Sequence, residues 1–142
     1  MSTEQIIHPD KYLEGEQPVL VELPELASAL GQEWTESYSG TLGESLLRLY
    51  LVELLEGEYV EAASGWGGDA YVVLESPTGQ QSLVSLLAWD TEADAEEFHQ
   101  LVIQDSGYLG HRFLGILGDR VLLIVAPDAA AVERLTDLFP EF

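Results

Sequence analysis

The chain has 142 residues, 46% of them apolar, which is enough for one domain with a hydrophobic core. Its 26 acidic residues against five basic ones give a formal net charge of −21, and a field of this sign repels nucleic acids and anionic membrane surfaces. The sequence contains no cysteine, which excludes disulfides, thiolate metal sites and cysteine nucleophiles.

The sequence also sets expectations for solubility and location. No apolar run approaches the roughly 20 residues that a membrane-spanning helix needs, and the N-terminus is polar and acidic. We therefore expect a soluble protein with no membrane span and no signal peptide, in an unknown compartment. The acidity is typical of a solvated, self-repelling surface. The alternative, a cation site, needs clustered oxygen ligands, and the sequence has no loop of the EF-hand type.

The first part of the chain, residues 1–64, is predicted to be mainly helical. Ser2 or Thr3 can cap a short helix that Pro9 ends. The segment PVLVELP, residues 18–24, is typical of an extended stretch bounded by prolines.

Two further helices are expected in this part. A helix that starts at Pro24 is capped by Gly31, and residues 32–40 are predicted to be a loop or a short strand. The clearest helix covers residues 41–57, and its first four residues, TLGE, match the S/T-x-x-E capping box. Its apolar residues form a broad band, so we expect it to be buried on most sides.

Residues 65–69, GWGGD, are predicted to form a glycine-rich corner. Three glycines in four residues permit backbone angles that a side chain would forbid, so the chain can turn sharply beneath Trp66. The indole is predicted to anchor the core with its N–H bonded to a carbonyl; alternatively, it forms the floor of a ligand pocket. Asp69 is predicted to pin the corner through main-chain amides. Trp66 and Asp69 are thus the candidate ligand-binding residues.

From residue 70 onward, a pattern of two strands and a helix occurs twice. Turn residues at 77–79 and 118–119 close two hairpins, and Thr91 and Asp128 have the side chains of helix N-caps. The predicted strands are 70–76, 81–89, 111–117 and 120–126, and the predicted helices are 91–104 and 128–139.

These two ββα units, residues 65–142, predict an α+β fold. Each unit has a sheet face and a helix stripe to bury, so the simplest arrangement is a four-stranded antiparallel sheet with both helices on one face. The N-terminal helical region, residues 1–64, would cover an open edge or the other face. No long linker divides the chain, so we expect residues 1–142 to form a single domain.

Three parts of the sequence resemble a known family: STEQIIHPDKY (2–12), TLGE (41–44), and GWGGD with WDTEADAEEF (65–69 and 89–98). Together they are similar to the C-terminal region of a family of zinc metallopeptidase-like proteins of bacteria and archaea, which are often extracytoplasmic. In that family an upstream helix carries H-E-x-x-H, whose histidines bind zinc and whose glutamate activates water. This sequence has no H-E-x-x-H. The resemblance therefore implies a part without a cofactor of its own, or one that holds zinc when another segment completes the site.

Glu4 and His8 are the candidate metal ligands. Their i, i+4 spacing puts them on one face of a helix, within reach of one cation. The resemblance implies that Glu4 supplies the carboxylate ligand of zinc. Two ligands are fewer than the three that a catalytic zinc keeps. The alternative is a capping glutamate and a histidine packed before a proline.

Three functions stay open at the level of sequence. The first is a non-catalytic packing or binding domain with a protein or peptide partner. The second is a part of a metal-dependent peptidase, in which Glu4 contributes a zinc ligand to a site completed by another segment or chain. The third is a small-ligand or peptide-binding module built around Trp66. No nucleotide-binding or serine-hydrolase motif occurs, so no catalytic residue is assigned. The natural ligand and the oligomeric state are left open.

Overall fold

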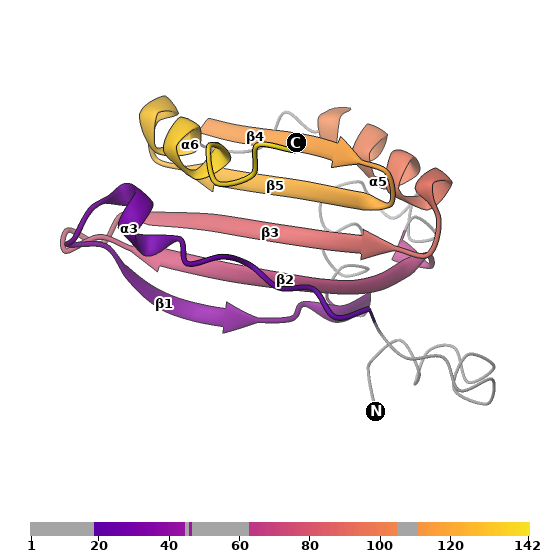
Figure 1. The fold of residues 1–142 in the computed structure, drawn as a ribbon, viewed down its shortest axis with the longest axis horizontal. Helices are drawn as coiled ribbons and strands as arrows, with labels where there is room; N and C mark the ends of the chain where they lie inside the picture. Colours follow the sequence, from indigo (N-terminus) through magenta and orange to yellow (C-terminus); the bar gives the residue numbers. More distant parts are fainter. Residues whose placement is uncertain (1–18, 45, 47–62, 105–110) are drawn as a thin grey trace.

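The computed structural model describes residues 19–44, 46, 63–104 and 111–142. These residues form an α+β fold around one antiparallel sheet with strand order β1-β2-β3-β5-β4 (Figure 1). The predicted fold class is thereby confirmed. The strands are β1 (Thr35–Gly40), β2 (Trp66–Glu75), β3 (Gln81–Trp89), β4 (His111–Leu117) and β5 (Arg120–Ala126), and the helices are α3 (Ala27–Leu30), α5 (Glu92–Gln104) and α6 (Ala129–Thr136). Among the described helices, none has the length and apolarity to cross a membrane.

The two ββα units lie where the sequence predicts them, because their turns and caps are strong local signals. Gly79 and Gly118 have φ values of 84° and 58°, in the left-handed region that tight turns require. The side chains of Thr91 and Asp128 each accept the main-chain N–H three residues further on, at 3.1 and 2.8 Å. These bonds satisfy N–H groups that have no partner inside the first turn of a helix.

The sheet has five strands rather than the predicted four, because residues 35–40 form an edge strand. β1 pairs antiparallel with β2, and a bulge interrupts the register between Glu36 and Tyr38. All six residues of β1 are exposed. Its sequence, TESYSG, lacks the alternation of apolar and polar residues that identifies a half-buried strand.

Most of the predicted helical part of residues 1–64 lies outside the described residues. Within the described residues, the helix predicted to start at Pro24 is the four-residue α3, which Gly31 ends with a φ of 125°, and residues 35–40 form β1. The predicted helix over 41–57 lies mostly outside the described residues, although Gly43, Glu44 and Leu46 are helical.

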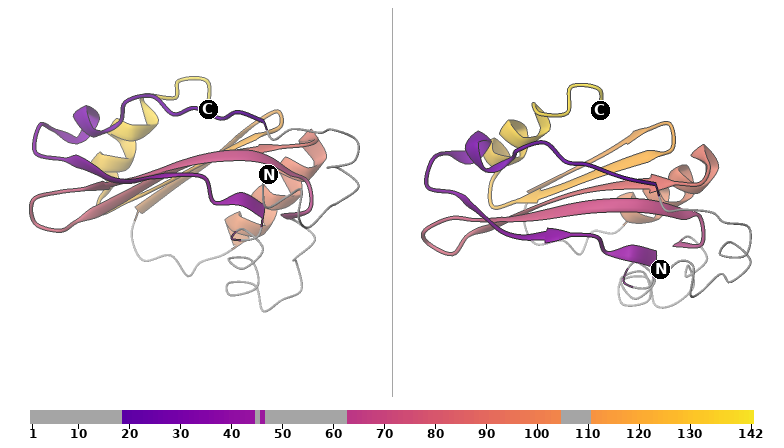
Figure 2. Two further views of the ribbon diagram at one scale, coloured as in Figure 1. Left: turned by 90° about the horizontal axis from the view of Figure 1, so that it is seen from below. Right: turned by 60° about the horizontal axis from the view of Figure 1, so that its bottom comes forward.

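The helices α5 and α6 cover opposite faces of the sheet, so the prediction that they share one face was wrong (Figure 2). α6 packs with α3 and residues 19–26 against one face, which includes Leu86 of β3. α5 packs against the other face, which includes Leu87 and Trp89 of the same strand. Since β3 and β5 carry apolar side chains on both sides, each face of the sheet needs its own cover.

Residues 66–69 of the glycine-rich run begin strand β2 and Gly65 lies in the turn before it, so the run does not form the predicted corner beneath Trp66. A bulge between Trp66 and Gly68 leaves Gly67 as the extra residue, and none of the glycines at 65, 67 and 68 has a positive φ. These glycines are better explained by the lack of room for a Cβ atom than by an unusual backbone angle. A Cβ on Gly68 would lie 2.1 Å from the carbonyl oxygen of Val19, because the N-terminal segment passes directly over it.

Residues 19–26 cross the α6 face of the sheet and connect to α3 (Figures 1 and 2). The N–H of Val19 donates to the carbonyl of Gly67 at 2.6 Å, and Val21 and Leu26 are buried in the core beneath α6. At the start of α3, hydrogen bonds from Ser28 lower the pKa of the exposed Glu25. The segment is therefore held by one main-chain bond and by apolar burial.

We predict that Gly68→Ala destabilises the protein by about 1–3 kcal/mol, because the added methyl forces the main chain at Val19 to move. Chemical denaturation measures this loss. Gly67→Ala is the matched control: its methyl would meet the side chain of Asp90 at 3.2 Å, which can shift, so the loss should be smaller. Equal unfolding midpoints for wild type and Gly68→Ala would contradict the close approach.

We also predict that Trp89→Ala lowers the free energy of unfolding by about 3–5 kcal/mol. Trp89 is 1% exposed and its ring lies 4.8 Å from that of Phe98 of α5, so truncation leaves a cavity under this helix. The control is Tyr38→Ala in β1, where the side chain is 69% exposed and the expected change is within about 0.5 kcal/mol. A small loss for Trp89→Ala in denaturant titrations would refute the core assignment.

Candidate functional site

The carboxylate of Asp69 is buried and binds three N–H donors. Its Oδ2 accepts the main-chain N–H of Leu42 at 2.7 Å, and its Oδ1 accepts that of Gly43 at 2.9 Å. The indole Nε1–H of Trp66 donates to the same Oδ1 at 3.1 Å. Hydrogen bonds to an ionised acceptor are among the stronger ones in proteins. This carboxylate therefore ties together two segments of the chain.

The position of Asp69 follows from where β1 ends. The last pair between β1 and β2 is Gly40↔Tyr71. Asp69 lies two residues before Tyr71 in β2, at a point where β1 has already left the sheet. The chain turns at this point, with Gly43 at a φ of 75°. The N–H groups of the turn then point at β2, and a carboxylate there satisfies them. The sequence predicted that Asp69 binds main-chain amides, but those amides belong to residues 42 and 43 rather than to the corner.

Trp66 lies next to Asp69 and is 3% exposed. Its ring belongs to the apolar cluster beneath α5, with Ala63 and Trp89. This agrees with the prediction of a core anchor, but the partner of the indole N–H is a carboxylate rather than a carbonyl. The predicted pair Trp66 and Asp69 is thus brought into direct contact by the fold.

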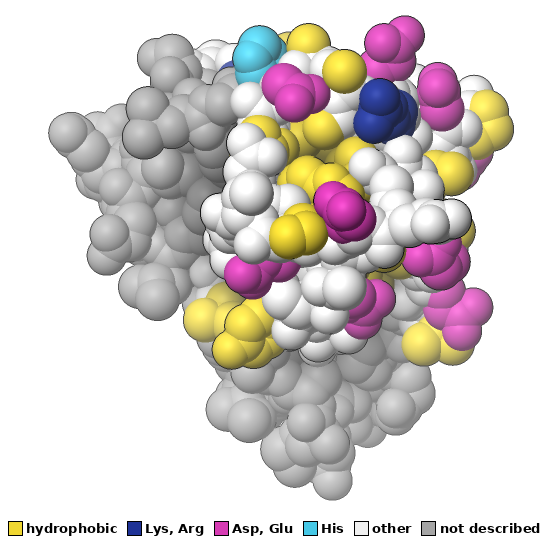
Figure 3. Space-filling model, turned by 90° about the vertical axis from the view of Figure 1, so that its left-hand side faces the viewer, with side chains coloured by type: hydrophobic (Ala, Val, Ile, Leu, Met, Phe, Trp, Pro, Cys, Tyr) yellow, Lys and Arg dark blue, Asp and Glu magenta, His cyan; other side chains and the backbone are white. Residues whose placement is uncertain are grey.

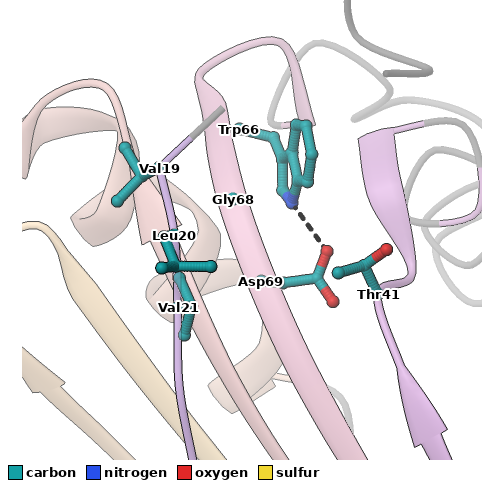
Figure 4. Close-up of a pocket in the computed structure, with 7 residues that line it drawn as sticks. All are labelled: Val19, Leu20, Val21, Thr41, Trp66, Gly68 and Asp69. Atoms are coloured by element: carbon teal, nitrogen blue, oxygen red, sulfur yellow. Dashed lines mark hydrogen bonds between the residues drawn. The ribbon is translucent and has the colours of Figure 1, made fainter. Parts of the chain in front are cut away.

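A groove of about 250 Å³ opens beside this pair (Figure 4). One wall is the N-terminal segment, where Val19 is 42% exposed and Leu20 is 81% exposed. Thr41 stands on the opposite side, and Gly68 lies between the two (Figure 4). The residues that line the groove are Val19, Leu20, Val21, Thr41, Trp66, Gly68 and Asp69. Both candidate ligand-binding residues therefore line the same groove.

The candidate metal ligands Glu4 and His8 lie outside the described residues, so the zinc hypothesis stays a prediction. Among the residues that the structure does describe, no group of three or more histidine, aspartate or glutamate side chains is placed to hold a metal ion.

Other polar side chains near the helices have structural partners. Asp94 accepts the hydroxyl of Thr91 at 2.6 Å at the start of α5. At the other end of this helix, the guanidinium of Arg112 donates to the carbonyls of Val102 and Ile103 at 3.2 and 3.4 Å. A cation at a helix C-terminus is favourable because the last carbonyls carry partial negative charge. These contacts stabilise α5 from both ends.

Apart from the buried Glu44 and Asp69, the acidic side chains of the described residues are exposed or half-buried. Figure 3 shows one end of the molecule, where acidic groups are scattered and apolar side chains gather between them in a shallow hollow. A second apolar hollow, of about 320 Å³, is lined by Val73, Gln81, Ser82, Leu83 and Val125. The exposure of the acidic side chains supports the interpretation of the charge as a solvated surface.

The sequence analysis missed the N-terminal wall of the groove. The described residues of the segment predicted to be extended, 19–24, belong to no helix or strand, and nothing local in the sequence places Val19 and Leu20 beside Trp66. The one signal that could have indicated a close approach is the glycine at position 68, since a buried strand glycine often marks a site where another segment passes.

We predict that Asp69→Ala destabilises the protein by about 3 kcal/mol or more, because it leaves two buried N–H groups and one partly buried N–H group without their acceptor. Asp69→Asn keeps one acceptor oxygen and should cost less. Chemical denaturation of Asp69→Asn, Trp66→Phe and the double variant gives a double-mutant cycle. We expect the two losses in the free energy of unfolding to depart from additivity by about 0.5 kcal/mol or more. Asp119→Ala, at an exposed turn, is the control. Strict additivity would show that the indole and the carboxylate do not interact.

The comparisons with known proteins give one match. The family described as a domain of unknown function (DUF8575) matches residues 32–112, from the approach to β1 to the start of β4. No curated protein and no solved structure matches the chain. The matched residues include Trp66, Asp69 and the N–H donors at 42 and 43, so the bonds of Asp69 lie within the family's own region. Because the match covers more than half of the 142 residues, the protein belongs to the DUF8575 family of domains of unknown function.

Proposed function

We propose that this protein is a non-catalytic binding domain that takes an extended protein or peptide segment in the groove between residues 19–21 and β2. The observation that carries the proposal is the state of Asp69. This residue is the buried acidic side chain of the groove, and its carboxylate already accepts three hydrogen bonds. A carboxylate engaged in this way is poorly placed to act as a base or a nucleophile.

The apolar wall of the groove supports binding. Leu20 is 81% exposed and Val19 is 42% exposed, so part of their apolar surface faces water beside a concave site. Burial of such side chains by a partner is favourable by about 1.5–3 kcal/mol for a fully covered leucine. Opposite them, Thr41 is an exposed hydroxyl that can form hydrogen bonds with a partner's main chain.

The net charge limits the class of partner that the groove can bind. A formal charge of −21 attracts cationic molecules over distances of about a Debye length and repels anionic ones. A segment that alternates basic and apolar residues suits both the field and the wall of Val19 and Leu20. Such a segment would gain its on-rate from charge and its affinity from apolar burial.

The proposal is tested with a short peptide of alternating lysine and leucine, followed through the indole N–H signal of Trp66 in nuclear magnetic resonance spectra. Trp66→Phe assigns this signal among the three tryptophans. Binding should shift the signal, because the indole lines the groove and donates to Asp69. A peptide of alternating glutamate and leucine is the charge control and should produce no shift.

We predict that Leu20→Ser weakens binding of the lysine–leucine peptide about tenfold, which corresponds to about 1.4 kcal/mol of lost apolar burial. The side chain is largely exposed, so the fold should be retained. Tyr38→Ser removes another exposed apolar side chain, from β1, and should leave the affinity unchanged. Equal affinities of wild type and Leu20→Ser, or no shift of the Trp66 signal at saturating peptide, would refute the proposed groove.

The second candidate function depends on the resemblance to zinc metallopeptidase-like proteins. There, Glu4 contributes a ligand to a zinc site that another segment or chain completes. Calorimetric titration with zinc tests it: binding by wild type that is lost in Glu4→Ala supports a ligand role. Unchanged affinity in that variant would exclude it. His8→Ala tests the second candidate ligand in the same way.

A further inference from the structure

The main chain of residues 20–23 has hydrogen-bonding groups that the described fold leaves unused. Residues 19–24 belong to no helix or strand, and the first three of them run beside β2 (Figure 4). Among the described residues, no main-chain hydrogen bond is formed by residues 20–23. Pro18 and Pro24 bound this stretch, and neither has an N–H to donate.

Burial alternates along this stretch, which is typical of an extended chain. Leu20 is 81% exposed and Glu22 is exposed, whereas Val21 is buried and Leu23 is half-buried. Val21 and Leu23 pack into the core beneath α6. A partner can therefore reach the chain at Leu20 and Glu22.

The contacts of Val19 identify which side of the stretch faces the sheet. Its N–H donates to the carbonyl of Gly67 at 2.6 Å, and its carbonyl oxygen would lie 2.1 Å from a Cβ on Gly68. Both main-chain groups of Val19 therefore point at β2. In an extended chain the N–H and C=O of one residue share a side, and successive residues alternate. The N–H and C=O groups of Leu20 and Glu22 therefore point away from β2.

We propose that the partner segment binds as an added β-strand, which pairs its main chain with the N–H and C=O groups of Leu20 and Glu22. The inference rests on the proposed function and specifies how the same site holds its partner. In strand addition the main-chain bonds supply affinity and alternate side chains supply specificity. A helical partner cannot form these bonds, because its own main-chain groups are bonded internally.

Charge favours a foreign basic strand over a second copy of this chain. Two copies with a formal charge of −21 repel each other, whereas a basic segment is attracted. Glu22 adds an exposed carboxylate beside the paired main chain. Side chains of opposite charge on paired strands stabilise each other, so this carboxylate suits a lysine or arginine of the partner.

Amide hydrogen exchange of the full chain, followed by nuclear magnetic resonance, tests the template. The amides of Leu20 and Glu22 should exchange rapidly in the free protein and about tenfold or more slowly with saturating lysine–leucine peptide. The amide of Glu33, in an exposed turn, is the control and should keep its rate. Slow exchange of Leu20 and Glu22 in the free protein overturns the proposal, because these groups would then be paired within the chain or between copies. Unchanged rates with bound peptide overturn it as well.

N-methylated peptides separate main-chain pairing from binding in the groove. Methylation of either every leucine or every lysine nitrogen removes the N–H groups along one edge of the strand and keeps all side chains. At least one of these two peptides should bind about tenfold more weakly than the unmethylated one, as followed through the Trp66 indole signal. Equal affinity of all three overturns strand addition and leaves the groove in place. Failure of the unmethylated peptide to bind refutes the proposed function instead.

A pair of variants tests the protein side of the same contact. Glu22→Pro removes the outward N–H together with the charge, whereas Glu22→Ala removes the charge alone. Glu22→Pro should therefore bind the lysine–leucine peptide about tenfold more weakly than Glu22→Ala. Thermal unfolding confirms that both variants are folded. Equal affinities of the two folded variants would overturn the proposal.

Discussion

A single buried carboxylate holds the groove end of the sheet together. Beyond Gly40 the chain leaves β2, and the N–H groups of residues 42 and 43 would be buried without partners if Asp69 did not accept them. The Oδ1 atom that accepts the N–H of Gly43 also accepts the indole N–H of Trp66. The bonds that stabilise this end of the fold therefore occupy both oxygens of the carboxylate. A protein rich in carboxylates thus uses the buried carboxylate of Asp69 as a structural bridge beside the groove.

The sequence predicted the hairpins well because their signals are local. Turn glycines at 79 and 118 and caps at 91 and 128 depend on residues a few positions apart. Which face each helix covers depends instead on the whole sheet. The signal for two faces was present, since RVLLIVA of β5 is apolar at successive positions and a strand with only one buried face would alternate. The predicted arrangement put both helices on one face and left only the N-terminal region to cover the apolar side chains of the other.

The rest of the site depends on contacts between residues far apart in the sequence. Val19 passes over Gly68, and Asp69 binds amides that lie 26 and 27 residues earlier. The glycines were correctly identified as important, but a glycine permits an unusual backbone angle and a close approach equally well, and the sequence alone does not distinguish the two. β1 was ambiguous for a related reason. An exposed edge strand buries no side chains, so no hydrophobic periodicity marks it.

The negative charge gives the few uncharged surfaces their importance. Repulsion among acidic side chains weakens contact between copies over most of the surface, and salt reduces it. Association is then limited to places where apolar groups or main-chain groups are accessible and carboxylates are absent or already bonded. The groove satisfies this condition because the carboxylate of Asp69 is bonded. Binding of a cationic ligand in the groove should weaken as salt is added, since the ligand loses attraction when the field is screened.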